Sequence, residues 1–458
     1  MKNRILLLMM ASGLIATAQL DKSSCPANLS IFAEFAKVKN YDSAYQPWLE
    51  VRNNCPELNV ATFKYGERIL NHKIKNATDD KAALQASLMS LYDDWLTYFP
   101  NTKRGASEVG KILSSKAQAM VDNKLGTKRE AYEIFDQAFT QDPNSFTSPK
   151  RLYTYFKTAY QLYKQGDKTA EVLFDKYEEV SEKFVLEQTN LAKKLDVILK
   201  KLETGEALTS REQRNKRVYE TNTLAFSTYA GNLDAMISKE SSCENLIPLY
   251  RKNFEANRSN SVWLNRAASR MDAKECADDP LFVELVEALH AINPSANSAY
   301  YLGILKDKAG ERKAALAYYE ESLTLEQDQY RKADILYKIA VKFKKRNLKS
   351  KSRSYARKAL KNRPSMGKAY MLIASLYAAS ANDCGNTQFE KRAVYWLAAK
   401  TARKAATVDS GVKKTALKLA ASYEGRAPSK TDIFTEGRAG ETISFSCWIN
   451  SSVTVPQL

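Results

Sequence analysis

Apolar and small residues recur at a fixed spacing in the second half of the chain. The pairs that carry the spacing are Leu302-Gly303, Ile339-Ala340 and Ile373-Ala374, separated by 37 and then 34 residues. An apolar or aromatic residue stands four positions before each small residue, at Ala299, Leu336 and Tyr370. This spacing puts both positions on one helix face, with a small residue where two helices can approach closely. The stretch 297–377 therefore predicts three helices in register.

Each of these helices is expected to be the first member of a helix pair. Second helices are indicated by Ala315-x3-Tyr319 and by Ser352-x3-Ala356, and Pro364 ends the latter. A unit of about 34 residues with small, aromatic and proline positions in this order is typical of the tetratricopeptide repeat. Because three copies of the first-helix pattern stand in register, the prediction of this repeat is specific.

The same pattern returns in the N-terminal half, in the stretches 44–56 and 131–143. Gly and Pro are scarce, with 16 and 12 residues, which favours a helical chain. The sequence thus predicts an all-α, right-handed superhelical solenoid of roughly seven to nine tetratricopeptide-like pairs.

One segment departs from the normal repeat length. Apolar residues continue at helical spacing from Leu173 to Leu202, Thr204-Gly205 breaks the helix, and Ser210 with Gln213 resembles a capping box. A hairpin of two long helices is expected to stand out from the solenoid here. It is either an elongated repeat or a docking arm or dimer contact.

The C-terminal end changes character. A capping helix is expected over 412–423, since a terminal repeat has no neighbour to cover its apolar face. Residues 442–449 then alternate apolar and polar, Asn450-Ser451 makes a turn, and 453–455 continue the alternation, which predicts a small β-hairpin. The resulting division is 1–18 signal peptide, 19–167 N-terminal repeats, 168–240 long hairpin, 241–425 C-terminal repeats and 426–458 tail.

The N-terminus predicts export. A Met-Lys-Asn-Arg start precedes the apolar run from Ile5 to Ala18 and the small-residue site Ala16-Thr17-Ala18. A run of this length is too short to cross a membrane, which needs about 20 residues. We therefore expect cleavage after residue 18 and a soluble, periplasmic protein.

Six cysteines follow the predicted cleavage site: Cys25, Cys55, Cys243, Cys276, Cys384 and Cys447. An even count in an oxidising compartment favours three disulfides over six buried thiols. The first two pairs are separated by about one repeat length, which places Cys25 near Cys55 and Cys243 near Cys276. Cys384 and Cys447 would pair by elimination and attach the tail to the last repeat.

The excess of positive charge is local. After removal of residues 1–18, 68 basic and 52 acidic residues remain, a net charge of +16. Between Lys338 and Lys368 there are 13 Lys or Arg and no Asp or Glu. The basic residues of this segment include Lys342, Lys344, Lys345, Arg346, Lys349, Lys351, Arg353, Arg357, Lys358, Lys361 and Arg363. We call them the basic stripe.

The stripe has two interpretations once export is taken into account. It is either a solvated face without a specific ligand or a surface for an acidic envelope partner, such as an acidic protein segment, an anionic lipid or a glycan. A nucleic-acid partner is not expected, because export separates the chain from nucleic acids.

Catalytic and metal-binding patterns are absent from the sequence. His72 and His290 lie in helix-like stretches without a ligand partner at suitable spacing, and no CxxC, HExxH, GxSxG or phosphate-loop pattern occurs. No cofactor and no metal are expected. An enzyme of an uncharacterised kind is the alternative to a binding scaffold.

The chain resembles the exported tetratricopeptide-repeat proteins of Bacteroidetes. The resemblance lies in Leu302-Gly303, in the stretch 390–399 and in Cys447-Trp448-Ile449. It implies a non-catalytic protein- or peptide-binding scaffold or adaptor in the cell envelope. The Lys/Asn carboxylate clamp of chaperone-binding relatives is absent, since the corresponding slots hold Tyr300, Ile304, Tyr337 and Val341. From the stacked first helices we expect a partner-binding groove that includes Tyr300, Tyr337, Lys344, Lys345, Lys368 and Met371.

Overall fold

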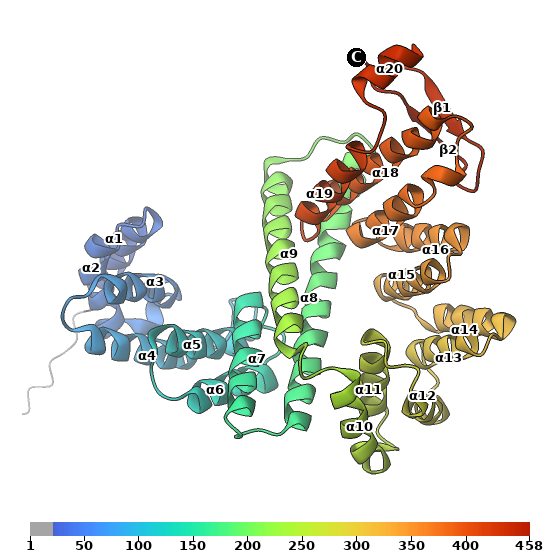
Figure 1. Cartoon of the computed structure of the whole chain (residues 1–458). Helices are drawn as coiled ribbons and strands as arrows, with labels where there is room; N and C mark the ends of the chain where they lie inside the picture. Colours follow the sequence, from blue (N-terminus) through green and yellow to red (C-terminus); the bar gives the residue numbers. More distant parts are fainter. Residues whose placement is uncertain (1–21) are drawn as a thin grey trace, which may run out of the picture. The chain divides into compact units, whose positions relative to one another are not determined.

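The computed structural model describes residues 22–458, so the predicted signal peptide lies outside the described residues. The chain is helical except for one two-stranded sheet in this range (Figure 1). It forms two compact units, with the boundary between Arg151 and Leu152. The all-α prediction with a small C-terminal hairpin is confirmed.

The first unit consists of three antiparallel helix pairs. Its helices are α1 (Cys25–Lys37), α2 (Tyr41–Asn54), α3 (Ala61–Asn76), α4 (Lys81–Tyr98), α5 (Val109–Asn123) and α6 (Lys128–Gln141), with a 3-10 turn η1 (Pro56–Leu58). Gly66 of α3 lies against the Trp48 ring, where an added Cβ would come within 2.6 Å. The Trp48 indole also donates to the Thr62 carbonyl at 2.7 Å. This contact explains the small and aromatic positions of the N-terminal pattern.

The second unit begins within α7 (Pro149–Lys164) and contains the long hairpin, α8 (Ala170–Glu203) and α9 (Ser210–Ile237). Shorter helices follow: α10 (Cys243–Asn257), α11 (Ser261–Ala273), α12 (Pro280–Ile292), α13 (Ala296–Lys308), α14 (Arg312–Leu325), α15 (Gln329–Lys345), α16 (Lys349–Asn362), α17 (Gly367–Ala378), η2 (Ala381–Asp383), α18 (Gln388–Val408), α19 (Lys413–Glu424) and α20 (Lys430–Glu436). From α11 to α18, odd-numbered helices are the first and even-numbered helices the second members of pairs.

The pairs follow the predicted register. Gly303 of α13 faces Tyr319 of α14, and a Cβ at position 303 would lie 2.5 Å from two carbons of that ring. In the next pair, the Ser352 hydroxyl of α16 donates to the Ala340 carbonyl of α15 at 2.7 Å. Small residues therefore permit close approach of the paired helices.

The capping box of α9 lies one residue earlier than predicted. Thr209 is the N-cap and accepts from the Glu212 amide, while the Glu212 carboxylate accepts from the Thr209 amide at 2.9 Å. Lys201 of α8 pairs with the same carboxylate at 2.6 Å. The lysine contact, followed by the Thr209 hydrogen bonds, lowers the pKa of Glu212 to about 2.

The long hairpin does not stand free of the repeats. Glu178 of α8 pairs with Arg270 of α11. Farther along α8, the Asp196 carboxylate accepts from the Tyr330 hydroxyl of α15 at 2.8 Å and from the Ser365 amide at 2.9 Å. Burial raises the pKa of Asp196. The hairpin is therefore joined to several repeats by buried polar contacts.

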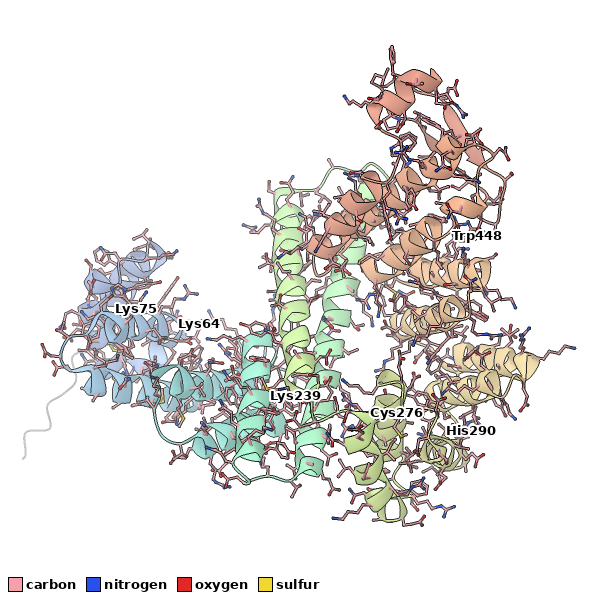
Figure 2. The ribbon with its side chains drawn as sticks, viewed as in Figure 1. Lys64, Lys75, Lys239, Cys276, His290 and Trp448 are labelled. Atoms are coloured by element: carbon pink, nitrogen blue, oxygen red, sulfur yellow. A yellow bond between two sulfur atoms is a disulfide. The ribbon has the colours of Figure 1, made fainter. Side chains whose placement is uncertain are left out.

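The three predicted disulfides are present. Cys25–Cys55, Cys243–Cys276 and Cys384–Cys447 have Cα separations of 6.4, 5.5 and 5.5 Å, and no free cysteine remains in residues 22–458. Cys276 is labelled in Figure 2. The first two bridges each close one helical hairpin, and the third attaches the C-terminal tail to the loop before α18.

The β-hairpin is shorter than its sequence pattern predicts. Strands β1 (Thr442–Phe445) and β2 (Ser451–Thr454) are antiparallel, with Ile443 opposite Val453. Residues 446–449 leave the ladder and form turns. The disulfide holds Cys447, and the Trp448 indole donates to the Ser380 hydroxyl at 3.0 Å (Figure 2). These tertiary contacts outweigh the local alternation.

Candidate partner-binding surface

The first helices of the C-terminal repeats share a polar side. Asp334, Lys338, Lys342 and Lys345 follow one another on α15 at intervals of three or four residues, so they lie on one helix face. Lys342 pairs with Asp272 of α11 at 2.6 Å, and Lys345 pairs with Glu275 directly after α11. We call this side, defined by Asp272, Asp334, Tyr337, Lys338, Lys342 and Lys368, the inner surface. Ion pairs link α11 directly to α15 on this surface, although α13 lies between them in the chain.

Two of the residues predicted to form the groove are packing residues. The side chain of Tyr300 is 1% exposed and lies against Tyr301 and Tyr319, and its hydroxyl donates to Asp272 at 3.4 Å. Met371 is half-buried and packs against the alanine cluster of α18 and α19. Tyr300 therefore supports the inner surface through Asp272, whereas Met371 belongs to the packing of α17 against α18 and α19.

Tyr337 and Lys368 do lie together. The Lys368 ammonium is 4.7 Å from the centre of the Tyr337 ring and 2.8 Å from the Asp334 carboxylate. Burial raises the pKa of the half-buried Tyr337, and the nearby Asp334 raises it further. Lys344 is turned toward the next repeat, where it donates to the Ser375 hydroxyl at 3.0 Å. The structure therefore brings together only part of the predicted groove.

Lys338 is the exposed cation of the inner surface that sequence reasoning did not single out. Its ammonium is 5.4 Å from the centre of the Tyr300 ring, and it forms no ion pair with a described residue. Desolvation lowers the pKa of Lys338, while Asp272 and Asp334 act in the opposite direction. The residue as a whole is exposed to solvent, while the protein around its ammonium desolvates that group. The three- and four-residue spacing along α15 was the signal that could have identified it.

The basic stripe does not form one continuous surface. Five of its cations, and Lys368 beside it, are paired with acids from neighbouring repeats: Lys342–Asp272, Lys345–Glu275, Arg346–Asp307, Lys349–Asp383, Arg363–Asp334 and Lys368–Asp334. A run without acids in the sequence is thus partly neutralised in three dimensions, because the repeat stacking brings acids from elsewhere beside it.

The two arginines of α16 are held by protein groups, and Arg353 holds the C-terminal tail. Arg353 donates to the carbonyl groups of Trp448, at 2.9 Å, and Ile449, and its guanidinium lies 5.0 Å from the centre of the Trp448 ring. Arg357 donates to the Tyr377 hydroxyl at 3.3 Å. The planar, multiply donating guanidinium suits such contacts better than a lysine does.

The lysines of α16 other than Lys349 remain at the surface. Lys351, Lys358 and Lys361 are exposed and form no ion pair with a described residue. Lys351 and Lys358 lie over the rings of Phe343 and Tyr355, at 5.8 and 4.9 Å from the ring centres. These three lysines are exposed members of the stripe that have no ion pair in the described part of the chain.

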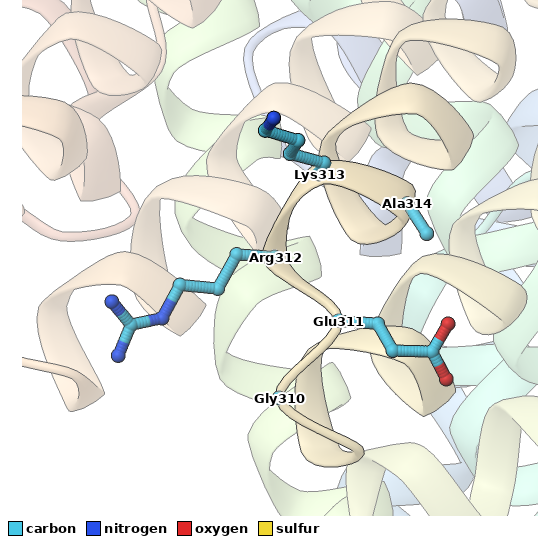
Figure 3. Close-up of a pocket in the computed structure, with 5 residues that line it drawn as sticks. All are labelled: Gly310, Glu311, Arg312, Lys313 and Ala314. Carbon is cyan, nitrogen blue, oxygen red and sulfur yellow. The ribbon is translucent and has the colours of Figure 1, made fainter.

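A depression at the turn between α13 and α14 offers little chemistry. Figure 3 shows its lining, Gly310, Glu311, Arg312, Lys313 and Ala314, all from one turn. Since no second element contributes a side chain, no functional groups converge there.

The histidines have ordinary partners. His72 lies 3.2 Å from the Asp42 carboxylate, and His290 lies 3.0 Å from the Ser298 hydroxyl. Residues 22–458 contain no group of three or more His, Cys, Asp or Glu placed to hold a metal ion. In the same part of the chain, no helix is both long enough and apolar enough to cross a membrane.

No protein-family model matches the sequence, and no curated protein matches it either. Among solved structures, a tetratricopeptide repeat protein from Parabacteroides merdae is 12% identical with a TM-score of 0.24, over 68% of this chain and 97% of that one. Human IFIT1, solved as a dimer with PPP-AAAA, is 15% identical with a TM-score of 0.27, over 88% and 96%. Yeast Tom70 is 11% identical with a TM-score of 0.27, over 88% and 96%. At these TM-scores the likenesses carry no argument, so the helix pairs themselves establish the repeat fold.

Proposed function

We propose that this chain is a non-catalytic scaffold that binds a protein or peptide on its C-terminal repeats. The observation that carries the proposal is Lys338, an exposed ammonium without an ion pair in a surface where its neighbours Lys342 and Lys368 are both paired. Three first helices contribute groups around it, through Asp272, Tyr300 and Lys368. A ligand lying across the repeats can therefore contact several helices at once.

The partner is an acidic segment of a protein. A carboxylate beside Lys338 would offset the effect of desolvation on its pKa, since an opposite charge favours the ammonium form. The half-buried Tyr337 and the charged pair Lys368–Asp334 flank the same helix face and offer ring and hydrogen-bonding contacts. An anionic envelope lipid or glycan is the alternative ligand.

The scaffold acts in the cell envelope, in an exported and periplasmic form. The proposal is supported by the signal-peptide pattern of the N-terminal sequence and by the three disulfides, since disulfides persist in oxidising compartments. The resemblance to exported repeat proteins of Bacteroidetes points in the same direction. The basic stripe contributes to this function through its accessible members.

Site-specific photo-crosslinking tests the proposal. A photoreactive amino acid replaces Lys338 in one variant and Lys313, an exposed residue of the α13–α14 turn, in the control. Both are expressed with the signal sequence and irradiated in intact cells. We expect a discrete envelope-protein adduct at position 338 only.

Two other results would contradict the proposal. Equal adduct patterns at both positions would mean that position 338 meets proteins only by random collision. Lipid or glycan adducts alone at position 338 would favour the alternative ligand.

A further inference from the structure

A second surface lies between two second helices, α14 and α16, and the first helix α15. An open depression of about 660 Å³ is formed by α14, the first half of α15 and the end of α16. Leu323 and Leu336 form its apolar part, and Lys332, Lys358 and Lys361 contribute ammonium groups. Glu320 is its acidic residue.

Three lysines without an ion pair to a described residue meet at this depression, whereas most other cations of this region are held by protein groups. Five members of the basic stripe and Lys368 have an acidic partner, and the two arginines of α16 hold the tail or Tyr377. Lys332, Lys358 and Lys361 have no ion pair within residues 22–458, although Glu320 lines the same depression. Unpaired like charges around one depression repel one another, which a bound anion would relieve.

The charges are unevenly distributed around the apolar part. Lys332 comes from α15 and the other two lysines from α16, whereas Glu320 and Leu323 come from α14. A ligand that fits must carry its negative charges on the α15–α16 side and an apolar group over Leu323 and Leu336. A lone phosphate or a uniformly charged polymer lacks that apolar group.

We propose that this depression binds an acidic protein segment that inserts one apolar side chain between its carboxylates. The positive charge of the three lysines and the apolar Leu323 and Leu336 in the same depression define this partner chemistry. The inference rests on the acidic partner of the proposed function and assigns it a second contact, separate from Lys338. Both contacts belong to the same repeat array, so one acidic partner can use both or two partners can bind independently.

Fluorescence anisotropy with the full mature chain tests the proposal. The probe is a labelled 15-residue peptide of repeated Glu-Glu-Leu-Glu-Glu, compared with an all-Glu peptide and with a peptide in which Gln replaces Glu. We expect the Glu/Leu peptide to bind most tightly, and its affinity to fall as salt rises, since exposed charges are screened over about 8 Å at physiological ionic strength.

The variant K358Q/K361Q should bind the Glu/Leu peptide about two- to twenty-fold more weakly, the loss expected for two exposed ion pairs. The control R312Q/K313Q removes the same charge from an exposed turn of the preceding repeat and should bind as the parent does. L323N tests the apolar contact and should reduce the preference for the Glu/Leu over the all-Glu peptide. Circular dichroism checks that each variant stays folded.

Three results would overturn the proposal. They are equal binding by K358Q/K361Q and R312Q/K313Q, equal binding of the Glu/Leu and all-Glu peptides by the parent, and binding to phosphatidylglycerol vesicles without binding to any peptide. Crosslinking at position 338 reports on the inner surface separately. An adduct there together with unchanged binding by K358Q/K361Q would therefore reject this depression while leaving the scaffold function in place.

Discussion

Replacing Gly303 with alanine tests whether close helix approach determines the repeat geometry. The added Cβ would lie 2.5 Å from two carbons of the Tyr319 ring and 3.3 Å from the Ala315 carbonyl oxygen. Tyr319 is 2% exposed and rests on Tyr300, at 6.0 Å between ring centres, so its ring has little room to move. Overpacking of this kind costs about 1–3 kcal/mol.

A second glycine supplies a matched control. Gly231 lies in α9, is exposed, and has nothing within 4 Å of an added Cβ. Both substitutions gain the preference of alanine over glycine in a helix, about 1 kcal/mol. G231A should therefore stabilise its helix by about 1 kcal/mol, whereas G303A should be between neutral and about 2 kcal/mol destabilising.

Hydrogen exchange measured by mass spectrometry, with the disulfides intact, compares the two variants. We expect faster exchange in α13 and α14 of G303A and slower exchange in α9 of G231A. If G303A slows exchange in α13 as much as G231A does in α9, the packing argument is refuted, because the Tyr319 ring then yields without cost.

Three further predictions concern the tail and the long hairpin. C447S opens the loop of 63 residues that the disulfide closes and should lower the free energy of unfolding by about 3–4 kcal/mol. The freed tail should be cleaved rapidly by a protease after residue 436, and a tail as resistant as that of the parent would contradict this. The pKa of Glu212 is depressed to about 2, so the stability that its carboxylate contributes is present above about pH 4.5 and is lost as the pH falls toward 2. E212Q should therefore flatten the acid-induced rise in the hydrogen-exchange rate of α9. An unchanged pH profile would count against the capping contact. Y330F leaves the buried Asp196 without one donor and should destabilise the junction of α8 with α15 by about 1–3 kcal/mol in urea unfolding; parent-like unfolding would show that this bond is dispensable.

The basic stripe shows the limit of sequence reasoning about the site. The local density of positive charge can be read from the sequence, but the sequence does not reveal that Asp272, Glu275 and Asp307 lie beside the stripe. Arg353 and Lys358 are both basic residues of the same predicted helix, and the sequence does not distinguish their roles. In the structure Arg353 holds the tail, whereas Lys358 lines a depression. Sequence spacing within one helix reports which residues share a face, whereas the partner of each face depends on how the helices stack.

Local patterns determined the elements because helix pairs are built from contacts between residues near in sequence. The spacing of Gly303 and Tyr319 is satisfied within one pair, and Cys25–Cys55 closes a single hairpin, so both were predictable from the sequence. The contacts of the long hairpin were not, since Asp196 meets Tyr330 across 134 residues and no periodicity extends that far. The tertiary structure alone decided that Lys338 stays without an ion pair among the described residues, because the stacking of the repeats determines which acids reach it. It also decided that the strand ends at residue 445, because the contacts of Cys447 and Trp448 with distant groups outweigh the local preference of the chain for a strand.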